Sequence, residues 1–134
     1  MKVAVTGATG FVGRHVISAL LKCDVQVVAV AREPERAFVP NDKLTLLAME
    51  MSDTRNPLAR MGNPDVLLHL AWGGLPHYQS ESHLHEQLPM QIAFLDACAQ
   101  GGLRHLVVTG TCLEYGMQSG CLEEGKAAAP VTSY

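Results

Sequence analysis

Apolar residues along the chain fall into five short runs that have the length and composition of β-strands. These runs are Lys2–Thr6, Val25–Val30, Leu44–Met49, Asp65–Ala71 and Leu103–Thr109. The second run, Val-Gln-Val-Val-Ala-Val, is rich in β-branched residues and apolar enough to be buried on both faces, as strands of parallel sheets are. The pattern therefore predicts a largely buried parallel sheet.

Segments with helical spacing separate most of these runs. The predicted helices are Phe11–Leu21, a short one at Pro34–Asn41, Asn56–Met61 and Glu86–Gln100. Apolar residues of the last helix recur at spacings of three and four, which predicts its buried face. They are Leu88, Ile92, Leu95 and Ala99. Strands that alternate with helices predict an α/β fold, a doubly wound Rossmann sheet of strand order 3-2-1-4-5.

The first strand leads into a glycine-rich turn, Thr-Gly-Ala-Thr-Gly-Phe-Val-Gly, at residues 6–13. Gly7 permits a tight turn, Gly10 lets phosphates approach the backbone, and Gly13 lets the helix pack against the strand. The helix N-terminus adds free N–H groups and a partial positive charge. The turn therefore predicts a site for the pyrophosphate of a dinucleotide; the alternative is an ordinary structural turn.

The end of the second strand bears on the choice of cofactor. An acid at this place takes the ribose hydroxyls of NAD, whereas an arginine accommodates the 2′-phosphate of NADP. Here Arg32 follows Ala31, and Arg36 comes one helical turn later. The nearest acid, Glu33, lies slightly beyond the position at which an acid binds the ribose of NAD. We therefore predict NADP in preference to NAD, bound through Arg32. The alternative is that Arg32 is a solvated loop charge.

The composition of the chain narrows its class. With 134 residues, 48% of them hydrophobic and 17% charged, it has room for one globular domain with a core. A net charge of -3 without a basic stripe argues against a nucleic-acid partner. The chain has no apolar run long enough to cross a bilayer and begins directly with a strand, so we expect no membrane segment or signal peptide and a cytoplasmic location. The four cysteines, which lack Cys-x-x-Cys spacing, are expected to be free thiols.

Histidines cluster in the polar stretch at residues 73–85, but their spacing does not predict a metal site. His83 and His85 lie two residues apart, which suits neither one helix face nor a recognised ligand pair, and no cysteine accompanies them or His77. We expect no metal, and a flexible loop over the active site instead. His69, alone in an apolar strand, is expected to be a satisfied core residue.

The turn at residues 6–13 resembles that of the short-chain dehydrogenase/reductase superfamily, specifically the extended class of nucleotide-sugar epimerases, dehydratases and reductases. Further motifs of that class follow in the same order over the whole chain. They are Glu50-Met51-Ser52-Asp53, His69-Leu70-Ala71-Trp72, Gly110-Thr111-Cys112-Leu113-Glu114-Tyr115-Gly116 and the stretch from Glu123 to Tyr134. Four residues depart from the pattern: Glu50 replaces an aspartate, Trp72 an alanine, Gly110 a serine, and Gln87 an asparagine in the last helix.

The resemblance, together with Arg32, implies where the cofactor lies. In the class, the acid at residue 50 meets the adenine amino group, the next residue packs on the ring, and the end of the fourth strand lies against the ribose and nicotinamide. The implied cofactor-binding residues are Gly7, Thr9, Gly10, Phe11, Val12, Gly13, Arg32, Glu50, Met51, Leu70, Ala71 and Trp72. The alternative for residues 50–53 is a helix N-cap formed by Ser52 or Asp53.

The resemblance also implies two catalytic residues. Thr111 corresponds to the active-site Ser/Thr, whose hydroxyl would bind the reacting substrate oxygen; the alternative is a turn hydroxyl at a strand end. Tyr134 corresponds to the tyrosine of Tyr-x-x-x-Lys, in which the lysine lowers the pKa of the phenol so that it serves as general acid and base. Because the sequence stops at Tyr134, we expect residues 1–134 to be an incomplete NAD(P)-binding domain, truncated before the substrate-binding part. Such a piece would bind cofactor without turnover.

The class implies a function: hydride transfer between a nicotinamide cofactor, NADP or NAD, and a sugar carbon of a small-molecule substrate, a nucleotide sugar. A homodimer is compatible with this interpretation. Two alternatives remain open, a non-catalytic NAD(P)-binding sensor or interaction protein and a reductase of small aldehydes or ketones. A lysine four residues beyond Tyr134 would favour the enzyme over the sensor.

Overall fold

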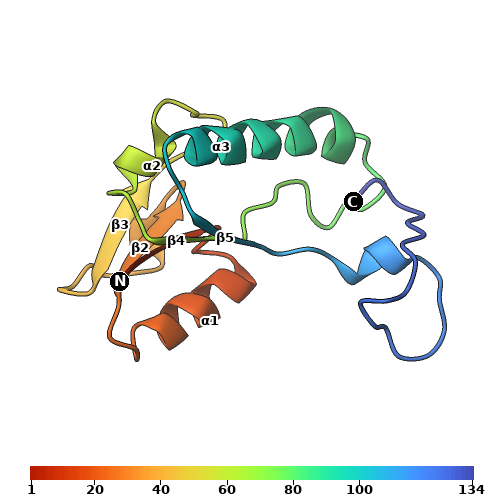
Figure 1. Ribbon diagram of the computed structural model, residues 1–134, viewed down its shortest axis with the longest axis horizontal. Coiled ribbons are helices and arrows are strands. Elements are labelled where there is room, and N and C mark those ends of the chain that lie inside the picture. The colour runs from red at the N-terminus through yellow and green to blue at the C-terminus, as the bar shows by residue number, and fades with distance from the viewer. The chain divides into compact units, whose positions relative to one another are not determined.

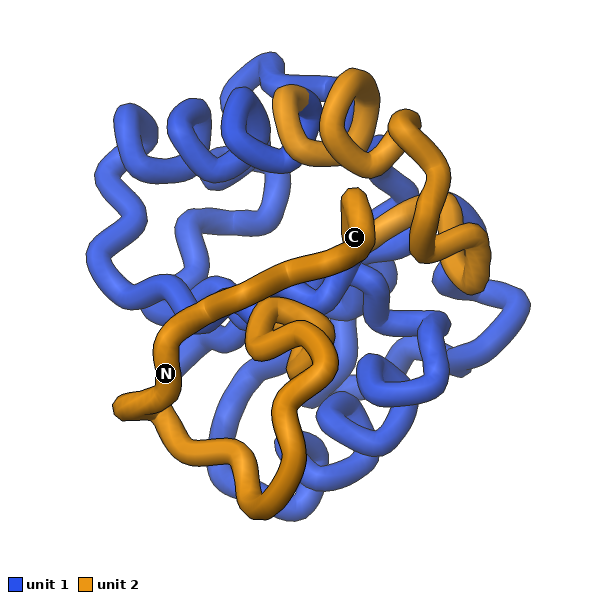
Figure 2. The backbone as a smooth tube through the Cα atoms, turned by 90° about the vertical axis from the view of Figure 1, so that its right-hand side faces the viewer, with its two compact units in different colours: residues 1–71, 90–109 blue, residues 72–89, 110–134 orange.

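The computed structural model describes residues 1–134, which divide into two compact units (Figure 2). Unit 1 comprises Met1–Ala71 and Met90–Thr109, and unit 2 comprises Trp72–Pro89 and Gly110–Tyr134. Unit 1 contains all five strands, whereas unit 2 consists mainly of turns and short helical segments.

The sheet of unit 1 has five parallel strands in the order β3-β2-β1-β4-β5, which confirms the predicted order 3-2-1-4-5. The strands are β1 (Lys2–Thr6), β2 (Gln26–Ala31), β3 (Leu44–Ala48), β4 (Val66–His69) and β5 (His105–Val108). In the central register, Val5 pairs with Ala29 of β2 and Leu68 of β4. The central strand β1 is almost wholly buried. Its carboxyl end leads directly into the glycine-rich turn.

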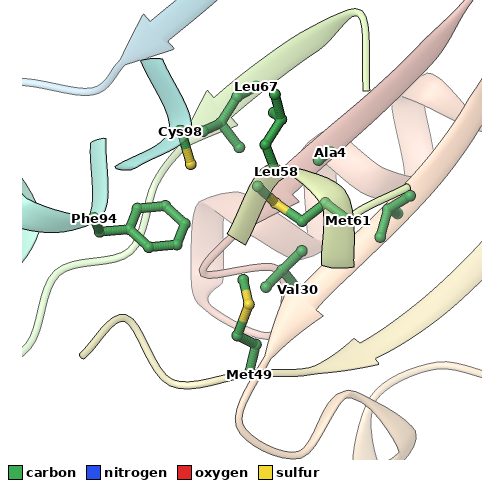
Figure 3. Packing of buried hydrophobic residues seen from close by; sticks show 9 residues of the cluster. Ala4, Val30, Met49, Leu58, Met61, Leu67, Phe94 and Cys98 are labelled. Carbon is green, nitrogen blue, oxygen red and sulfur yellow. The ribbon is translucent and has the colours of Figure 1, made fainter. Parts of the chain in front are cut away.

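Helices cover both faces of this sheet (Figure 1). They are α1 (Phe11–Leu20), α2 (Pro57–Arg60) and α3 (Leu88–Gln100), the last of which lies in unit 1 from Met90 onward. On the side of α1, Ile17 packs among valines of β1 and β2. On the other side, Leu58 of α2 and Phe94 and Cys98 of α3 pack against the sheet, as Figure 3 shows. None of the helices has the length and apolar character needed to span a membrane.

Two of the shorter predicted helices are corrected by the structure. The segment 34–41 forms only the 3₁₀ turn η1 (Pro34–Arg36), because Pro40 lacks the N–H that would continue a helix. The segment 56–61 shortens to α2, whose N-cap is Asn56 at φ 48°. The alternative of an N-cap at Ser52 or Asp53 is therefore wrong.

The predicted buried face of the last helix is wrong for three of its four residues, and only Leu95 packs against the core. The buried residues of α3 are Gln91, Phe94 and Cys98, whereas Leu88 and Ile92 are 41% and 51% exposed. The helix is rotated in this way because the amide of Gln91 has a buried polar partner, His69. The one-turn π-helical segment η2 (His83–Gln87) precedes α3, so helical structure begins three residues before the predicted start.

Candidate cofactor and active sites

The glycine-rich turn after β1 has no room for a side chain at two positions. Gly7 has φ 65°, and a Cβ placed there would lie 2.9 Å from the backbone nitrogen of Ala71. A Cβ on Gly13 would overlap the carbonyl oxygen of Gly7 and lie 2.7 Å from that of Ala8. The turn therefore packs directly against the end of β4 on one side and against the first turn of α1 on the other.

The N-terminus of α1 is open to solvent. Gly10 is its N-cap, with no side-chain cap, and no acidic residue stands in the first turn. Phe11 and Val12 are 76% and 52% exposed, and first-turn N–H groups have no partner within a helix. Unpaired donors and the positive end of the helix dipole make this terminus suitable for an anion such as a pyrophosphate.

Two adjoining pockets in unit 1 share Arg32 and Glu50. One has a volume of about 660 Å³ and is also lined by Thr9, Glu33 and Arg36. The other has a volume of about 580 Å³ and extends along the loop from residue 48 to residue 55. Arg36 forms an ion pair with Glu33 at 3.0 Å, whereas Arg32 forms none. The structure thus brings together Thr9, Arg32 and Glu50, which lie far apart in the sequence.

The carboxylate of Asp53, in the loop after β3, accepts hydrogen bonds from two arginines. Hydrogen bonds from Arg55 lower the pKa of the Asp53 carboxyl to about 2, with a smaller contribution from the charge of Arg60. Arg60 also donates to Asp53 at 2.6 Å. Met51 is half-buried against the core. Glu50 is therefore the acid of this segment that has no ion-pair partner.

A buried polar network fixes the end of β4. Thr6 donates to His69 Nδ1 at 2.9 Å, and because Gln91 Oε1 can only accept, the proton lies on His69 Nε2, 2.8 Å away. Burial lowers the pKa of His69, so this tautomer is uncharged near neutral pH. Thr6 Oγ1 in turn accepts from the backbone N–H groups of Leu70 and Ala71. The prediction of a satisfied core histidine is confirmed.

Unit 2 contains an open pocket of about 1110 Å³ that both predicted catalytic residues line. Its walls come from residues 75–80, 111–113, 132 and 134. Thr111 Oγ1 accepts from the backbone N–H of Leu113 at 3.2 Å and so caps the 3₁₀ turn η3 (Cys112–Tyr115). This is the turn role considered above, and it leaves the hydroxyl proton free for another acceptor. The structure thus brings Thr111 to the same pocket as Tyr134.

Tyr134 and Tyr115, both in unit 2, differ in their surroundings. The phenol oxygen of Tyr134 has no hydrogen-bond partner within the chain, and the residue lines the pocket. Tyr115 lies outside the pocket lining, and desolvation together with the neighbouring Glu114 raises the pKa of its phenol. The pocket is thus lined by Tyr134 and Tyr78 and not by Tyr115.

Sequence reasoning missed several residues of unit 2 that surround Tyr134. His83 is buried rather than part of a flexible loop, and it hydrogen-bonds Trp72. Gln87, at the place of the asparagine of the resemblance, accepts from the backbone N–H of Gly73. Trp72 is thus one of the residues around Tyr134. Its contact with a cofactor stays a prediction. No local pattern could have revealed these contacts, because each joins residues 11 or more positions apart.

Comparisons with known proteins agree with this architecture. The chain is 27% identical over 136 residues to dTDP-6-deoxy-L-talose 4-dehydrogenase (NAD(+)) from Aggregatibacter actinomycetemcomitans, an alignment that covers 100% of this chain and 50% of that protein. A crystal structure of UDP-galactose 4-epimerase is similar at a TM-score of 0.81 and 25% identity, over 100% of this chain and 46% of that one. MoeE5 in complex with UDP-glucose and NAD is similar at 0.78 and 26%, over 100% and 44%.

The chain spans about half the length of the curated relatives that it matches. Its match to a family model, described as that of the NAD dependent epimerase/dehydratase family, extends over residues 3–134. That extent includes the glycine-rich turn, the two pockets beside Arg32 and the pocket lined by Thr111 and Tyr134. This chain therefore belongs to the NAD dependent epimerase/dehydratase family.

Proposed function

We propose that residues 1–134 are the dinucleotide-binding part of an NAD(P)-dependent epimerase, dehydratase or dehydrogenase that acts on a nucleotide sugar. The observation that supports this most is the free N-terminus of α1, which follows a turn with no room for side chains at Gly7 and Gly13. The relatives support the substrate class, because their names specify dTDP- and UDP-sugars. We further propose a cytoplasmic homodimer.

The proposed cofactor contacts follow the turn and the pockets of unit 1. Backbone N–H groups at Phe11 and Val12 would donate to the pyrophosphate, and Glu50 would accept from the adenine amino group. Gly7, Thr9, Gly10, Gly13, Met51, Leu70, Ala71 and Trp72 complete the proposed set. Arg32, which has no ion-pair partner, would bind a 2′-phosphate, so we propose NADP in preference to the NAD that the relatives' names specify.

The proposed proton transfer uses the two residues that line the pocket of unit 2. The chemistry that the dinucleotide supplies when bound is hydride exchange. The phenolate of Tyr134 would take the proton of the reacting sugar hydroxyl as the carbon that bears this hydroxyl is oxidised, and the resulting phenol would return the proton on reduction. The free hydroxyl proton of Thr111 would bond to the same oxygen and stabilise the charge that develops there.

A turnover assay of the full-length protein tests this function. With UDP-glucose, UDP-galactose, UDP-glucuronic acid and dTDP-6-deoxy-L-talose as probes, we expect at least one to be oxidised or epimerised. Tyr134→Phe should lower kcat by about 100-fold or more, since general acid–base catalysis contributes that much. Tyr115→Phe is the matched control and should leave kcat within about twofold, because Tyr115 lies outside the pocket.

Other outcomes would favour the alternatives. Cofactor binding without turnover of any sugar nucleotide, aldehyde or ketone would indicate a non-catalytic sensor. Turnover of small aldehydes or ketones alone would indicate a reductase. Full activity of Tyr134→Phe would contradict the role proposed for this tyrosine.

A further inference from the structure

Three aromatic side chains of unit 2 surround the ring of Tyr134. We call Trp72, Tyr78 and His83 the aromatic seat. Their ring centroids lie 5.9, 5.6 and 5.2 Å from that of Tyr134, with interplanar angles of 69°, 55° and 57°. Edge-to-face and tilted arrangements at these distances are favourable for aromatic pairs. The ring of Tyr134 is thus held by contacts with defined geometry.

The members of the seat are themselves held by hydrogen bonds. The Trp72 indole N–H donates to His83 Nδ1 at 3.0 Å, and His83 Nε2 lies 3.0 Å from the carbonyl oxygen of His77. An indole can only donate and a carbonyl can only accept, so these two partners place the imidazole proton on Nε2. The two rings also stack, with centroids 6.1 Å apart and an interplanar angle of 23°.

The backbone around Tyr134 adds a second constraint. Its N–H donates to the carbonyl oxygen of Tyr78 at 3.2 Å, and the Thr132 hydroxyl donates to the Tyr134 carbonyl oxygen at 3.1 Å. Both nitrogens of His83 are occupied within the chain and the residue is fully buried, so it cannot contact a molecule in the pocket. Any effect of His83 on the reaction must therefore pass through the residues that it contacts, among them Tyr134.

We propose that Trp72 and His83 are positioning residues that hold the phenol of Tyr134 in the orientation needed for proton exchange in the pocket. This inference rests on the proposed function, in which Tyr134 exchanges the proton. Proton transfer depends steeply on geometry, so loss of the Trp72–His83 hydrogen bond should lower the rate of proton exchange.

Fluorine NMR of the full-length protein labelled with 3-fluorotyrosine tests the inference directly. The signal of Tyr134 is assigned by its loss in Tyr134→Phe. Trp72→Phe keeps a ring but removes the N–H donor, and His83→Phe keeps a ring but removes both hydrogen bonds. Each should shift or broaden the Tyr134 signal and leave the Tyr115 signal in place. His85→Phe, at an exposed position of the same π-helical segment, should move neither signal.

The same variants have a kinetic readout. On a sugar nucleotide that the protein turns over, Trp72→Phe and His83→Phe should lower kcat about tenfold. In His83→Phe, which replaces a residue outside the proposed cofactor set, KM and the cofactor Kd should stay within about twofold. An unmoved Tyr134 signal in both variants, or an equal movement in His85→Phe, would overturn the inference. If no probe is turned over, the proposed function fails, and the fluorine NMR signals alone decide this inference.

A second measurement covers variants that do not fold. The indole ¹H–¹⁵N signal of Trp72, assigned by its loss in any soluble Trp72 variant or by selective labelling, should move in the conservative variant Tyr134→Phe. It should stay in place in Tyr115→Phe. No movement in Tyr134→Phe would show that the seat and Tyr134 are not coupled and would overturn the inference.

Discussion

At the scale of single residues, the charge pattern around the pockets of unit 1 decides which groups can meet a cofactor. Glu33 is paired with Arg36, and Asp53 is bound by Arg55 and Arg60, whereas Arg32 has no ion-pair partner. An arginine in that state is available for a phosphate, to which it can donate two parallel hydrogen bonds. The sequence indicated Arg32, but the pairing of its neighbours is visible only in the structure.

Arg32→Ala should therefore remove the preference for NADP. We expect the Kd for NADP⁺ to rise about tenfold or more, the value of one charge-assisted hydrogen bond, with the Kd for NAD⁺ nearly unchanged. Calorimetric titration of both nucleotides checks this. Arg36→Ala is the matched control, since Arg36 is already paired with Glu33. Equal dissociation constants for the two nucleotides in the unmodified protein would refute the NADP assignment.

His69 gives a pH dependence whose sign follows from its burial. Burial lowers the pKa of His69 below its ordinary 6.5, so the unfolded chain takes up the proton first as the pH falls. The free energy of unfolding should thus decrease from about pH 6.5 downward, by up to about 1.4 kcal/mol per pH unit for this group.

Urea unfolding between pH 7.5 and pH 4.5 measures that slope. His69→Asn removes the titrating group and should flatten the slope, whatever its effect on absolute stability. His85→Asn, at an exposed position, should preserve the slope of the unmodified protein. A slope that is identical in His69→Asn and the unmodified protein would contradict the buried, uncharged state of His69.

At the scale of elements, the junction of β1, the glycine-rich turn and α1 is the most constrained part of the chain. The carbonyl oxygens of Gly7 and Ala8 occupy the space that a side chain at residue 13 would need. The backbone of Leu70 and Ala71 likewise leaves no room for a Cβ on Gly7 and is fixed by hydrogen bonds to Thr6. The start of α1 and the end of β4 are thereby held in one arrangement.

Gly13→Ala should disrupt this junction. The added methyl group overlaps the Gly7 carbonyl oxygen, so α1 must shift, at a cost of about 1–3 kcal/mol in the free energy of unfolding. The affinity for NAD⁺ or NADP⁺ should fall about tenfold or more, because the donors at the helix start move with it. Gly125→Ala, where nothing lies within 4 Å of the new Cβ, should change neither quantity. A Gly13→Ala protein with unaltered affinity would show that the turn does not bind the dinucleotide.

The helices and strands also show how much of the structure could be predicted from the sequence. Strand order and the glycine-rich turn were predictable because they depend on local runs and short spacings. The buried face of α3 was not, because a buried polar pair, His69 and Gln91, overrides the apolar pattern of Leu88 and Ile92. The group around Tyr134 was hidden for a similar reason: Trp72 and His83 meet only through folding.

At the scale of the whole molecule, the two units have different proposed tasks. Unit 1 presents the open helix terminus and the pockets beside Arg32, which suit a dinucleotide. Unit 2 presents Thr111 and Tyr134 on one pocket wall, which suit proton exchange with a substrate. The family model matches residues 3–134, which include parts of both units. Both tasks are therefore proposed for one protein. Of the two, dinucleotide binding is the claim on which the others depend.

The most direct test is a crystal structure of the full-length protein soaked with NADP⁺ and, separately, with NAD⁺. The account predicts a pyrophosphate at the start of α1, within hydrogen-bond distance of the N–H groups of Phe11 and Val12, and an adenosine beside Arg32 and Glu50. A glycine-rich turn that stays empty at saturating nucleotide, or a nucleotide bound elsewhere, would contradict it.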